Sequence, residues 1–285
     1  MRLMNDQILT IDRKKCTGCL LCEKVCIRNA VNAGEFSIDK LKCFSCFHCV
    51  SVCPEQAVLY NGSCTNKLSD YKIADKEFDN LIFSRRSCRV FTDKIIESRI
   101  LDEITHLLSY SPTGSNSQNV HLTILSGRRR IRKLTDGVIN LFGFILRLKL
   151  LFFPLLLIIL GLKNTRKFFG MKNGVNRYYK GEDILAFNAP VLILFHSSSK
   201  ISSTPAEDCD IAASISMLKA EIMGLGTCFN GFIVRALNFS RKLRRDVEIP
   251  SDHRIYTSLL LGYPGVKYKN LIYRNPLKIN HLNDE

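Results

Sequence analysis

The feature that most constrains this chain is a spacing of four cysteines that occurs twice between residues 16 and 54. The first run contains Cys16, Cys19, Cys22 and Cys26, and the second contains Cys43, Cys46, Cys49 and Cys53, an offset of 43 − 16 = 27 residues. Pro54 closes the second run. In this C-x2-C-x2-C-x3-C spacing, three thiolates of a run bind one [4Fe–4S] cluster and the fourth binds the other cluster.

The geometry explains why the ligand sets cross. Three thiolates separated by two residues can wrap one face of a cubane on a tight loop, and the fourth sulfur then points to the neighbouring cubane. We assign the first cluster to Cys16, Cys19, Cys22 and Cys53, and the second to Cys43, Cys46, Cys49 and Cys26. Ile27 replaces the typical Pro after Cys26, which removes no ligand. Over about residues 8–60 the segment resembles a bacterial two-cluster ferredoxin.

A pair of zinc sites is the alternative for these cysteines, because C-x2-C pairs also hold tetrahedral zinc. Zinc usually takes its four ligands as two pairs separated by a longer spacer. The third cysteine in each run fits that arrangement poorly.

The length of 285 residues suits one or two domains, and most of it remains for a second domain with a full core. Thiolate clusters need a reducing compartment. The opening residues 1–6 are short and polar, unlike a signal peptide. We therefore expect a cytoplasmic protein in an organism or compartment poor in oxygen.

The formal net charge of +15 overstates the charge of the loaded protein. Each oxidised cluster with its four thiolates carries −2, so two clusters lower the total to about +11, and one bound phosphate to about +9. Such a surface could attract an acidic electron carrier, nucleic acid or anionic lipid, or could be merely solvated. No nucleic-acid-binding motif accompanies the charge, so we expect no nucleic-acid partner.

Apolar patterning predicts an α+β fold behind the ferredoxin-like module. Polar, turn-rich residues separate the two parts, giving domains at 1–62 and 79–285 and a linker at 63–78. Short apolar runs predict strands at 7–11, 57–60, 120–124, 190–195 and 255–261, and helical spacing predicts helices at 96–108 and 211–225. The apolar stripe of the second helix consists of Ile211, Ile215, Leu218, Ile222 and Leu225.

The very apolar residues 138–162 form an insert in the second domain. The uninterrupted apolar run at 150–162 has 13 residues, short of the ~20 that a membrane-spanning helix needs. Arg147, Lys149 and Pro154 interrupt the longer stretch. We predict a helical hairpin that covers a pocket or a subunit seam, with peripheral membrane contact as the alternative.

A second constellation of residues opens the second domain. Arg85, Arg86, Ser87 and Arg89 lie within five residues, and guanidinium forks match phosphate oxygens. The charged first turn of a helix would have the same composition, so this cluster alone does not distinguish a phosphate site from a helix start. Three further segments follow it, at 110–118, 224–232 and 262–274. In this order and at these intervals, residues 78–280 resemble the nitroreductase family of FMN enzymes.

The resemblance implies an FMN site built from four segments. Its phosphate and ribityl end would be held by Arg85, Arg86, Ser87, Arg89 and Arg274. The segment reaching the flavin from a partner subunit would contain Pro112, Thr113, Gly114, Asn116 and Gln118, and the stretch beside the ring Phe229, Asn230 and Gly231. Arg177 and Lys180 are candidates for a basic group from the middle of the chain, and Asp208 and Asp210 are interpreted as helix caps.

These observations predict an iron–sulfur flavoprotein oxidoreductase, a homodimer with two flavins at its interface. Electrons would pass from two [4Fe–4S] clusters to FMN and on to a nitroaromatic, quinone or activated alkene. Ferredoxin, flavodoxin or NAD(P)H is the candidate donor. The alternative is an electron-transfer or flavin-holding protein without small-molecule turnover, membrane-attached in one variant.

Cofactor analysis of anaerobically purified protein tests both assignments. We expect about eight iron and about eight acid-labile sulfide atoms per chain, with one FMN. Zinc in place of iron would overturn the cluster assignment. Full iron without flavin would overturn the assignment of the arginine cluster and favour the electron carrier.

Overall fold

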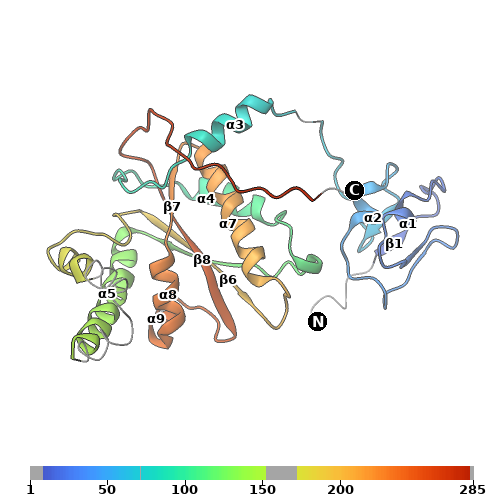
Figure 1. Ribbon diagram of the computed structural model, residues 1–285. Coiled ribbons are helices and arrows are strands. Elements are labelled where there is room, and N and C mark those ends of the chain that lie inside the picture. Colours follow the sequence, from blue (N-terminus) through green and yellow to red (C-terminus); the bar gives the residue numbers. More distant parts are fainter. Residues whose placement is uncertain (1–8, 71, 152–171, 283–285) are drawn as a thin grey trace.

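The computed structural model describes residues 9–70, 72–151 and 172–282. They form a small N-terminal module and a larger α+β domain, joined by an extended segment that leads to helix α3 (Asp75–Ser84) (Figure 1). Because α3 begins inside the segment predicted as a linker, helical structure starts before residue 79.

The N-terminal module consists of short elements around two cysteine loops. They are β1 (Leu9–Ile11), α1 (Leu21–Lys24), β2 (Val31–Asn32), β3 (Ser37–Ile38), α2 (His48–Val52) and β4 (Val58–Tyr60). The first and last strands pair antiparallel, with Thr10 opposite Leu59. The structure thus contains both strands predicted at the ends of the module.

The module's backbone repeats with the same 27-residue offset as its cysteines. Left-handed φ angles occur in equivalent pairs: Gly18 (70°) and Ser45 (56°), Leu20 (60°) and Phe47 (62°), Asn29 (48°) and Gln56 (51°). Non-glycine residues rarely adopt this conformation, which costs roughly 1–3 kcal/mol each. Its repetition shows that both loops wrap their cysteines in the same way.

The larger domain is built on a four-stranded antiparallel sheet with strand order β5-β6-β8-β7. Its strands are β5 (His121–Ser126), β6 (Val191–Ser198), β7 (Gly226–Phe229) and β8 (His253–Gly262). Its other elements are α4 (Ser98–Leu108), the 3-10 turn η1 (Gly114–Asn116), α5 (Arg128–Leu151), α7 (Pro205–Ile222), α8 (Gly231–Phe239) and α9 (Arg241–Asp246). The predicted strands near 120, 190 and 255 and the predicted helix near 100 are all present.

Helices cover both faces of the sheet (Figure 1). Side chains alternate between the two faces of a strand, so Leu192 and Leu194 of β6 pack with α5, α8 and α9. Ile193 and Phe195 of the same strand pack with α4 and α7 on the other face. The central strand β6 is buried along its whole length, which explains its continuous apolar sequence.

Helix α7 buries a different face from the one predicted. The sequence pattern pointed to an isoleucine–leucine stripe, yet Ile211 is 38 % exposed and Ile222 is 67 % exposed. The buried face carries small residues, including Ala212, Ala213 and Ser216. Small side chains let the helix lie close to the sheet. The residues on this face are therefore buried because the helix backbone approaches the sheet closely, and not because their side chains are large.

The apolar insert is described only in part. Helix α5 runs from Arg128 to Leu151, and the rest of the predicted helical hairpin, to residue 162, lies outside the described residues. In the described parts of the chain, no helix combines the length and hydropathy needed to cross a bilayer.

Three histidines meet where β5, β6 and β8 lie side by side. His121 and His253 have ring centroids 4.7 Å apart, and the Nδ1 atoms of His196 and His253 are 2.9 Å apart. His196 is 3 % exposed. Burial, then the neighbouring His253 and His121, lower the pKa of His196 to about 4; burial also lowers the pKa of His253.

This cluster predicts loss of stability in mild acid. The folded-state pKa of His196 lies below its ordinary value of 6.5, so the unfolded chain binds more protons between about pH 6.5 and 4. Stability should therefore fall with pH through that window, by on the order of 2 kcal/mol at pH 5. Denaturant midpoints at pH 7 and pH 5 measure the loss.

The variant His196→Gln should show a smaller midpoint change between the two pH values than the parent protein. The exposed His106 supplies the control, because His106→Gln should retain the parental change. Equal pH dependence in all three proteins would contradict the prediction.

Candidate functional site

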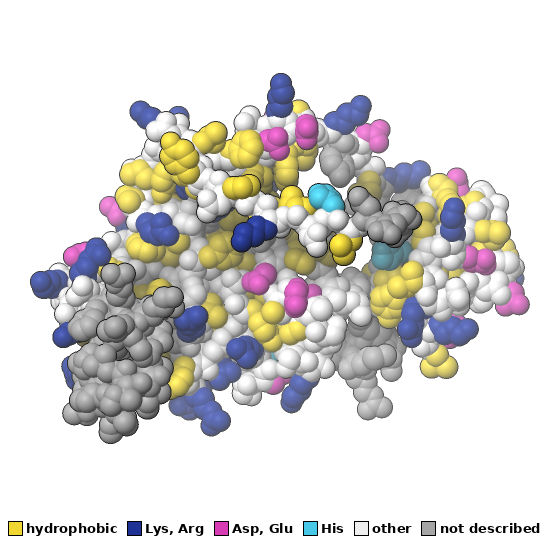
Figure 2. All heavy atoms as spheres, viewed as in Figure 1, with side chains coloured by type: hydrophobic (Ala, Val, Ile, Leu, Met, Phe, Trp, Pro, Cys, Tyr) yellow, Lys and Arg dark blue, Asp and Glu magenta, His cyan; other side chains and the backbone are white. Residues whose placement is uncertain are grey.

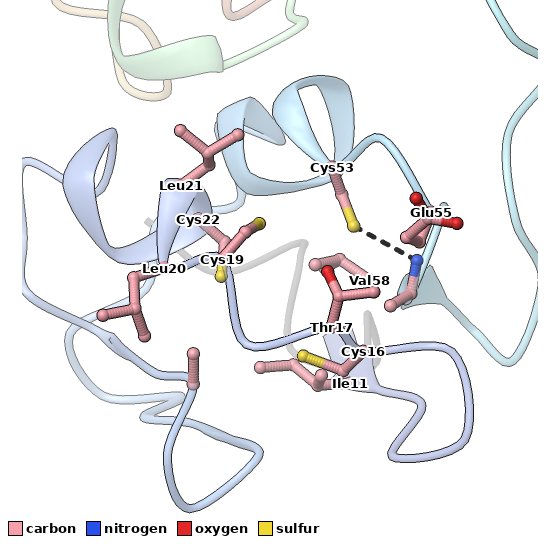
Figure 3. A pocket seen from close by; sticks show the side chains of 12 residues that line it. Ile11, Cys16, Thr17, Cys19, Leu20, Leu21, Cys22, Cys53, Glu55 and Val58 are labelled. Carbon is pink, nitrogen blue, oxygen red and sulfur yellow. Dashed lines mark hydrogen bonds between the residues drawn. The ribbon is translucent and has the colours of Figure 1, made fainter.

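The four cysteines assigned to the first cluster surround one cavity (Figure 3). Cys16, Cys19, Cys22 and Cys53 all line it, together with apolar side chains such as Ile11 and Val58. Three of these cysteines come from the first run, and the fourth comes from the end of α2. The structure thus brings the predicted set together, including the member from the other run.

The second set surrounds a second cavity. Cys43, Cys46, Cys49 and Cys26 line it, with Leu9, Val31 and Phe47 among the apolar neighbours. His48 also lines this cavity. Each cavity thus receives three thiols from one run and one from the other, as the crossed assignment requires.

Backbone N–H groups point at several of these sulfurs. Ala30 N donates to Cys26 Sγ and Ala57 N donates to Cys53 Sγ, each at 3.2 Å and again 27 residues apart. Such hydrogen bonds stabilise thiolates and tune cluster potentials. Burial, followed by neighbouring Cys43 and Cys46, raises the pKa of Cys49 to about 11. A bound cationic iron core would reverse this, because metal coordination deprotonates thiols.

The zinc alternative requires a tighter arrangement than these cavities provide. A single tetrahedral ion needs its ligand atoms within a few ångströms of one centre. Among the described residues, no three Cys, His, Asp or Glu side chains converge in that way. The cysteines surround cavities instead, which fits an iron–sulfur cubane better.

The arginine cluster lies against the edge strand of the sheet. Ser87 forms an isolated parallel β-bridge with Thr227 of β7, and Cys88 N donates to Thr227 O at 2.8 Å. A Cβ on Gly226 would lie 2.7 Å from Cys88 Cβ, so the glycine allows this close approach. Because side chains alternate along extended backbone, the inward Cys88 leaves Ser87 and Arg89 on the opposite face. We name Arg85, Arg86, Ser87 and Arg89 the arginine cradle.

Arg86 shows that the cradle is suited to an anion. Its Nη1 donates to Phe83 O at 2.6 Å and to Arg85 O at 2.7 Å, while its Nε is buried and has no partner among the described residues. An unsatisfied buried donor costs roughly 1–3 kcal/mol, which a phosphate oxygen would offset. The C-terminal segment reaches the cradle at Asn270 O, 3.5 Å from Arg86 Nη2. Arg274 lies four residues further on and is exposed.

The segment around η1 is fixed by a buried carboxylate. Asp208 in the first turn of α7 is 1 % exposed and accepts from Gly114 N at 2.9 Å. It also accepts from Ser202 Oγ at 2.5 Å and Thr204 Oγ1 at 2.9 Å. Interpreted from sequence as a helix cap, Asp208 instead anchors a loop 94 residues away, a pairing without a local sequence signal.

The three residues predicted beside the flavin ring differ in what they can offer. Asn230 is buried, and its side chain caps α8 by accepting from Ile233 N at 3.1 Å and donates to Leu185 O. Its own N–H donates to Ser258 O, so neither group is free for a ligand. Gly231 opens α8, where the first N–H groups lack intrahelical acceptors, and a Cβ there would meet open space. Phe229 is 42 % exposed.

Within the described residues, neither mid-chain candidate forms a hydrogen bond or ion pair with the cradle. Arg177 is exposed and donates from Nη2 to Glu182 Oε2 at 2.6 Å, and this partner raises the pKa of Arg177. Lys180 follows it in an exposed turn.

The cradle and the η1 segment lie at opposite ends of α7. Ser84, beside the cradle, donates to Glu221 in the last turn of the helix. Gly114 donates to Asp208 in its first turn. These two anchors are 221 − 208 = 13 residues apart along the helix, which corresponds to about 20 Å at 1.5 Å per residue. One chain therefore does not bring the two predicted halves of the flavin site together.

Comparison with known proteins identifies both parts. The nitroreductase family model matches residues 82–263, and a 4Fe-4S dicluster domain model matches residues 8–54. The first match spans 182 of 285 residues, so the chain belongs to the nitroreductase family. The predicted fold, architecture and oxidoreductase class are thereby confirmed.

Individual relatives agree with this placement. A 4-nitrobenzoate reductase of Nocardioides sp. is 24 % identical over 229 residues, covering 72 % of this chain and 88 % of that protein. The fold is shared with a nitroreductase with bound FMN from Bacteroides fragilis (TM-score 0.56, 18 % identity, 72 % of this chain and 99 % of that one). A similar structure from Desulfitobacterium hafniense, also with bound FMN, has a TM-score of 0.55, 17 % identity and coverage of 73 % and 98 %.

Substitutions in the cradle should weaken flavin binding. Arg89→Ala removes a cationic fork, and a charge-assisted hydrogen bond contributes about 1.5–3 kcal/mol, so FMN affinity should fall by about tenfold or more. Arg89→Lys keeps the charge without the fork and should lose less. Fluorescence titration of flavin-stripped protein with FMN measures each affinity.

Arg99 on α4 is the control, because it is exposed and its ion-pair partner is Glu103 of the same helix. Arg99→Ala should bind FMN like the parent protein. If Arg89→Ala also bound FMN normally, the cradle would not hold the phosphate.

Proposed function

We propose that this chain is an iron–sulfur flavoprotein oxidoreductase. The two cysteine-lined cavities hold two [4Fe–4S] clusters, the arginine cradle holds FMN, and electrons pass from the clusters to the flavin and on to an oxidised small molecule. The observation that carries this proposal is that each cavity collects three cysteines from one run and the fourth from the other. The spacing of bacterial two-cluster modules requires this crossing.

We propose the following roles for the flavin-site residues. Arg85, Arg86, Ser87 and Arg89 bind the phosphate, with Arg274 approaching on the C-terminal segment. The Gly231 N–H faces the ring edge, next to Phe229 and the backbone of Asn230. When bound, FMN supplies hydride chemistry and exchanges single electrons for pairs, and the protein orients it.

The second half of each flavin site comes from a partner subunit in a homodimer. The anchors of this segment and of the cradle on α7 are about 20 Å apart, so we assign Pro112, Thr113, Gly114, Asn116 and Gln118 to the partner's site. The exposed apolar residues Ile211 and Ile222 of α7 and Tyr273 and Leu277 of the C-terminal segment support an interface. Figure 2 shows further hydrophobic side chains gathered over α3 and its surroundings.

The donor is a low-potential one-electron carrier, ferredoxin or flavodoxin, with NAD(P)H as the competing donor. The acceptor is a nitroaromatic, a quinone or an activated alkene. In Figure 2, Lys and Arg side chains are spread over the visible face, which suits weak steering of an acidic carrier better than nucleic-acid binding. We place the protein in the cytoplasm, where thiolate clusters persist.

Anaerobic reduction of the bound flavin tests the electron path. Reduced ferredoxin should bleach the flavin absorbance of the parent protein. In Cys46→Ser, which removes a ligand of the second set, the rate should fall by more than about tenfold, a barrier increase above about 1.4 kcal/mol. FMN content should stay unchanged, and Cys64→Ser, an exposed cysteine outside both sets, should behave like the parent.

Three results would contradict the proposal in different ways. Equal rates in Cys46→Ser and the parent would remove the clusters from the path. Faster reduction by NAD(P)H than by ferredoxin in both proteins would make the nicotinamide the donor. Cofactors that cycle without turnover of any acceptor would favour an electron carrier.

A further inference from the structure

One residue connects the second cysteine set to the flavin segment. Ser45 lies between Cys43 and Cys46, and its amide N donates to Cys43 Sγ at 3.4 Å. Its carbonyl oxygen accepts from Asn116 Nδ2, in η1 of the other domain, at 2.7 Å. A ligand of the second cluster is therefore one residue away from the segment predicted to contact a flavin.

Both sides of this contact are held in place. Ser45 and Asn116 adopt left-handed φ angles of 56° and 51°, which persist only where the surroundings enforce them. Ser45 is 9 % exposed although it lies in a loop. The Asp208 carboxylate fixes η1 through Gly114.

In the part of the chain that the structure describes, the loop of the first cysteine run has no equivalent hydrogen bond to the larger domain. Gly18 is the counterpart of Ser45 at the 27-residue offset, and a Cβ on Gly18 would have no atom within 4 Å. Leu20, the counterpart of Phe47, is 51 % exposed. The two loops share a backbone conformation, yet among the described residues only the second forms a hydrogen bond with the larger domain.

The contact also selects which flavin the module approaches. Asn116 lies in η1, which is anchored at the first turn of α7, about 20 Å along the helix from the anchor of the cradle of the same chain. In a two-fold dimer, a segment can complete a binding site on the partner subunit. Any loop that is hydrogen-bonded to this segment then also lies near the partner's site. Here that loop is the loop of the second cysteine set.

Resting on the proposed function, we propose that the second cluster is the exit toward the flavin, and that it serves the flavin held by the partner subunit. Asn116 is the positioning residue that docks the loop. Each reduced cluster loses one electron and returns to its oxidised state. Two such electrons and one proton convert oxidised flavin to its anionic, fully reduced form, and a one-electron low-potential carrier protein resupplies the clusters.

Heterodimers isolated with two affinity tags test the crossed path. In the first, one chain carries Arg85→Ala with Arg89→Ala and its partner carries Cys46→Ser. The only filled cradle then lies opposite the only intact second cluster, so reduced ferredoxin should bleach its flavin at a rate within about twofold of the parent dimer's. In the second, one chain carries all three substitutions and its partner none, and bleaching should slow more than tenfold.

The reverse result, with the second heterodimer fast and the first slow, would overturn the crossed path. Equal rates in both would show that each cluster set reaches both flavins, which also overturns it. Slow bleaching in the unmodified dimer, with full cofactor content, would instead overturn the proposed function itself.

Hydrogen exchange of the holoenzyme tests the contact without turnover. Asn116→Leu keeps the side-chain size but removes the donor, so amides of residues 44–48 should exchange more than tenfold faster, while residues 17–21 stay unchanged. An EPR-monitored titration should show a shifted potential for one cluster only. Ser115→Ala, in the same turn, should change neither. Unchanged exchange in Asn116→Leu would show that Asn116 does not hold the loop.

Discussion

The rigid placement of α7 against the sheet is the constraint on which the rest of the site depends. Its buried face carries Ala212, Ala213 and Ser216, so the helix lies close to β6 and β8 and has little freedom to tilt. Its last turn positions the cradle through Glu221, and its first turn positions η1 through Asp208. The distance between the two half-sites is thereby set by one helix.

The same separation connects oligomerisation with chemistry. A protein that bound both ends of a flavin within one chain could work as a monomer. Its ferredoxin module could then be attached through a flexible linker alone. In the proposed homodimer, the two half-sites of one chain belong to different flavin sites. Flavin binding, subunit pairing and docking of the iron–sulfur module would then depend on one another. The flavin would then stabilise the dimer as well as react in it, because a ligand that binds only the assembled state favours that state.

The sequence predicted best what local geometry determines. Cysteine spacing predicted which four cysteines share each cavity, because a cubane requires a fixed wrapping of the chain. The apolar runs of β6 and β8 have the length of buried strands, and both are strands. The prediction of the buried face of α7 was wrong. The sequence pattern suggested that Ile211 and Ile222 are buried, but both are exposed and the buried face carries small residues. The contact between Ser45 and Asn116 spans 71 residues and two loops, and no periodicity or spacing encodes such a pairing.

The unequal surroundings of the two cysteine loops have a consequence for the lifetime of the protein in air. Cys19 is exposed, whereas its counterpart Cys46 is half-buried beside the docked loop. Oxidation of cysteine follows thiolate character and access, so dioxygen would reach the outward cluster first. Oxidative damage would begin at the first cluster, which accepts electrons from the donor, and would reach the second cluster later. A briefly aerated molecule would therefore lose electron uptake before it lost electron transfer to the flavin.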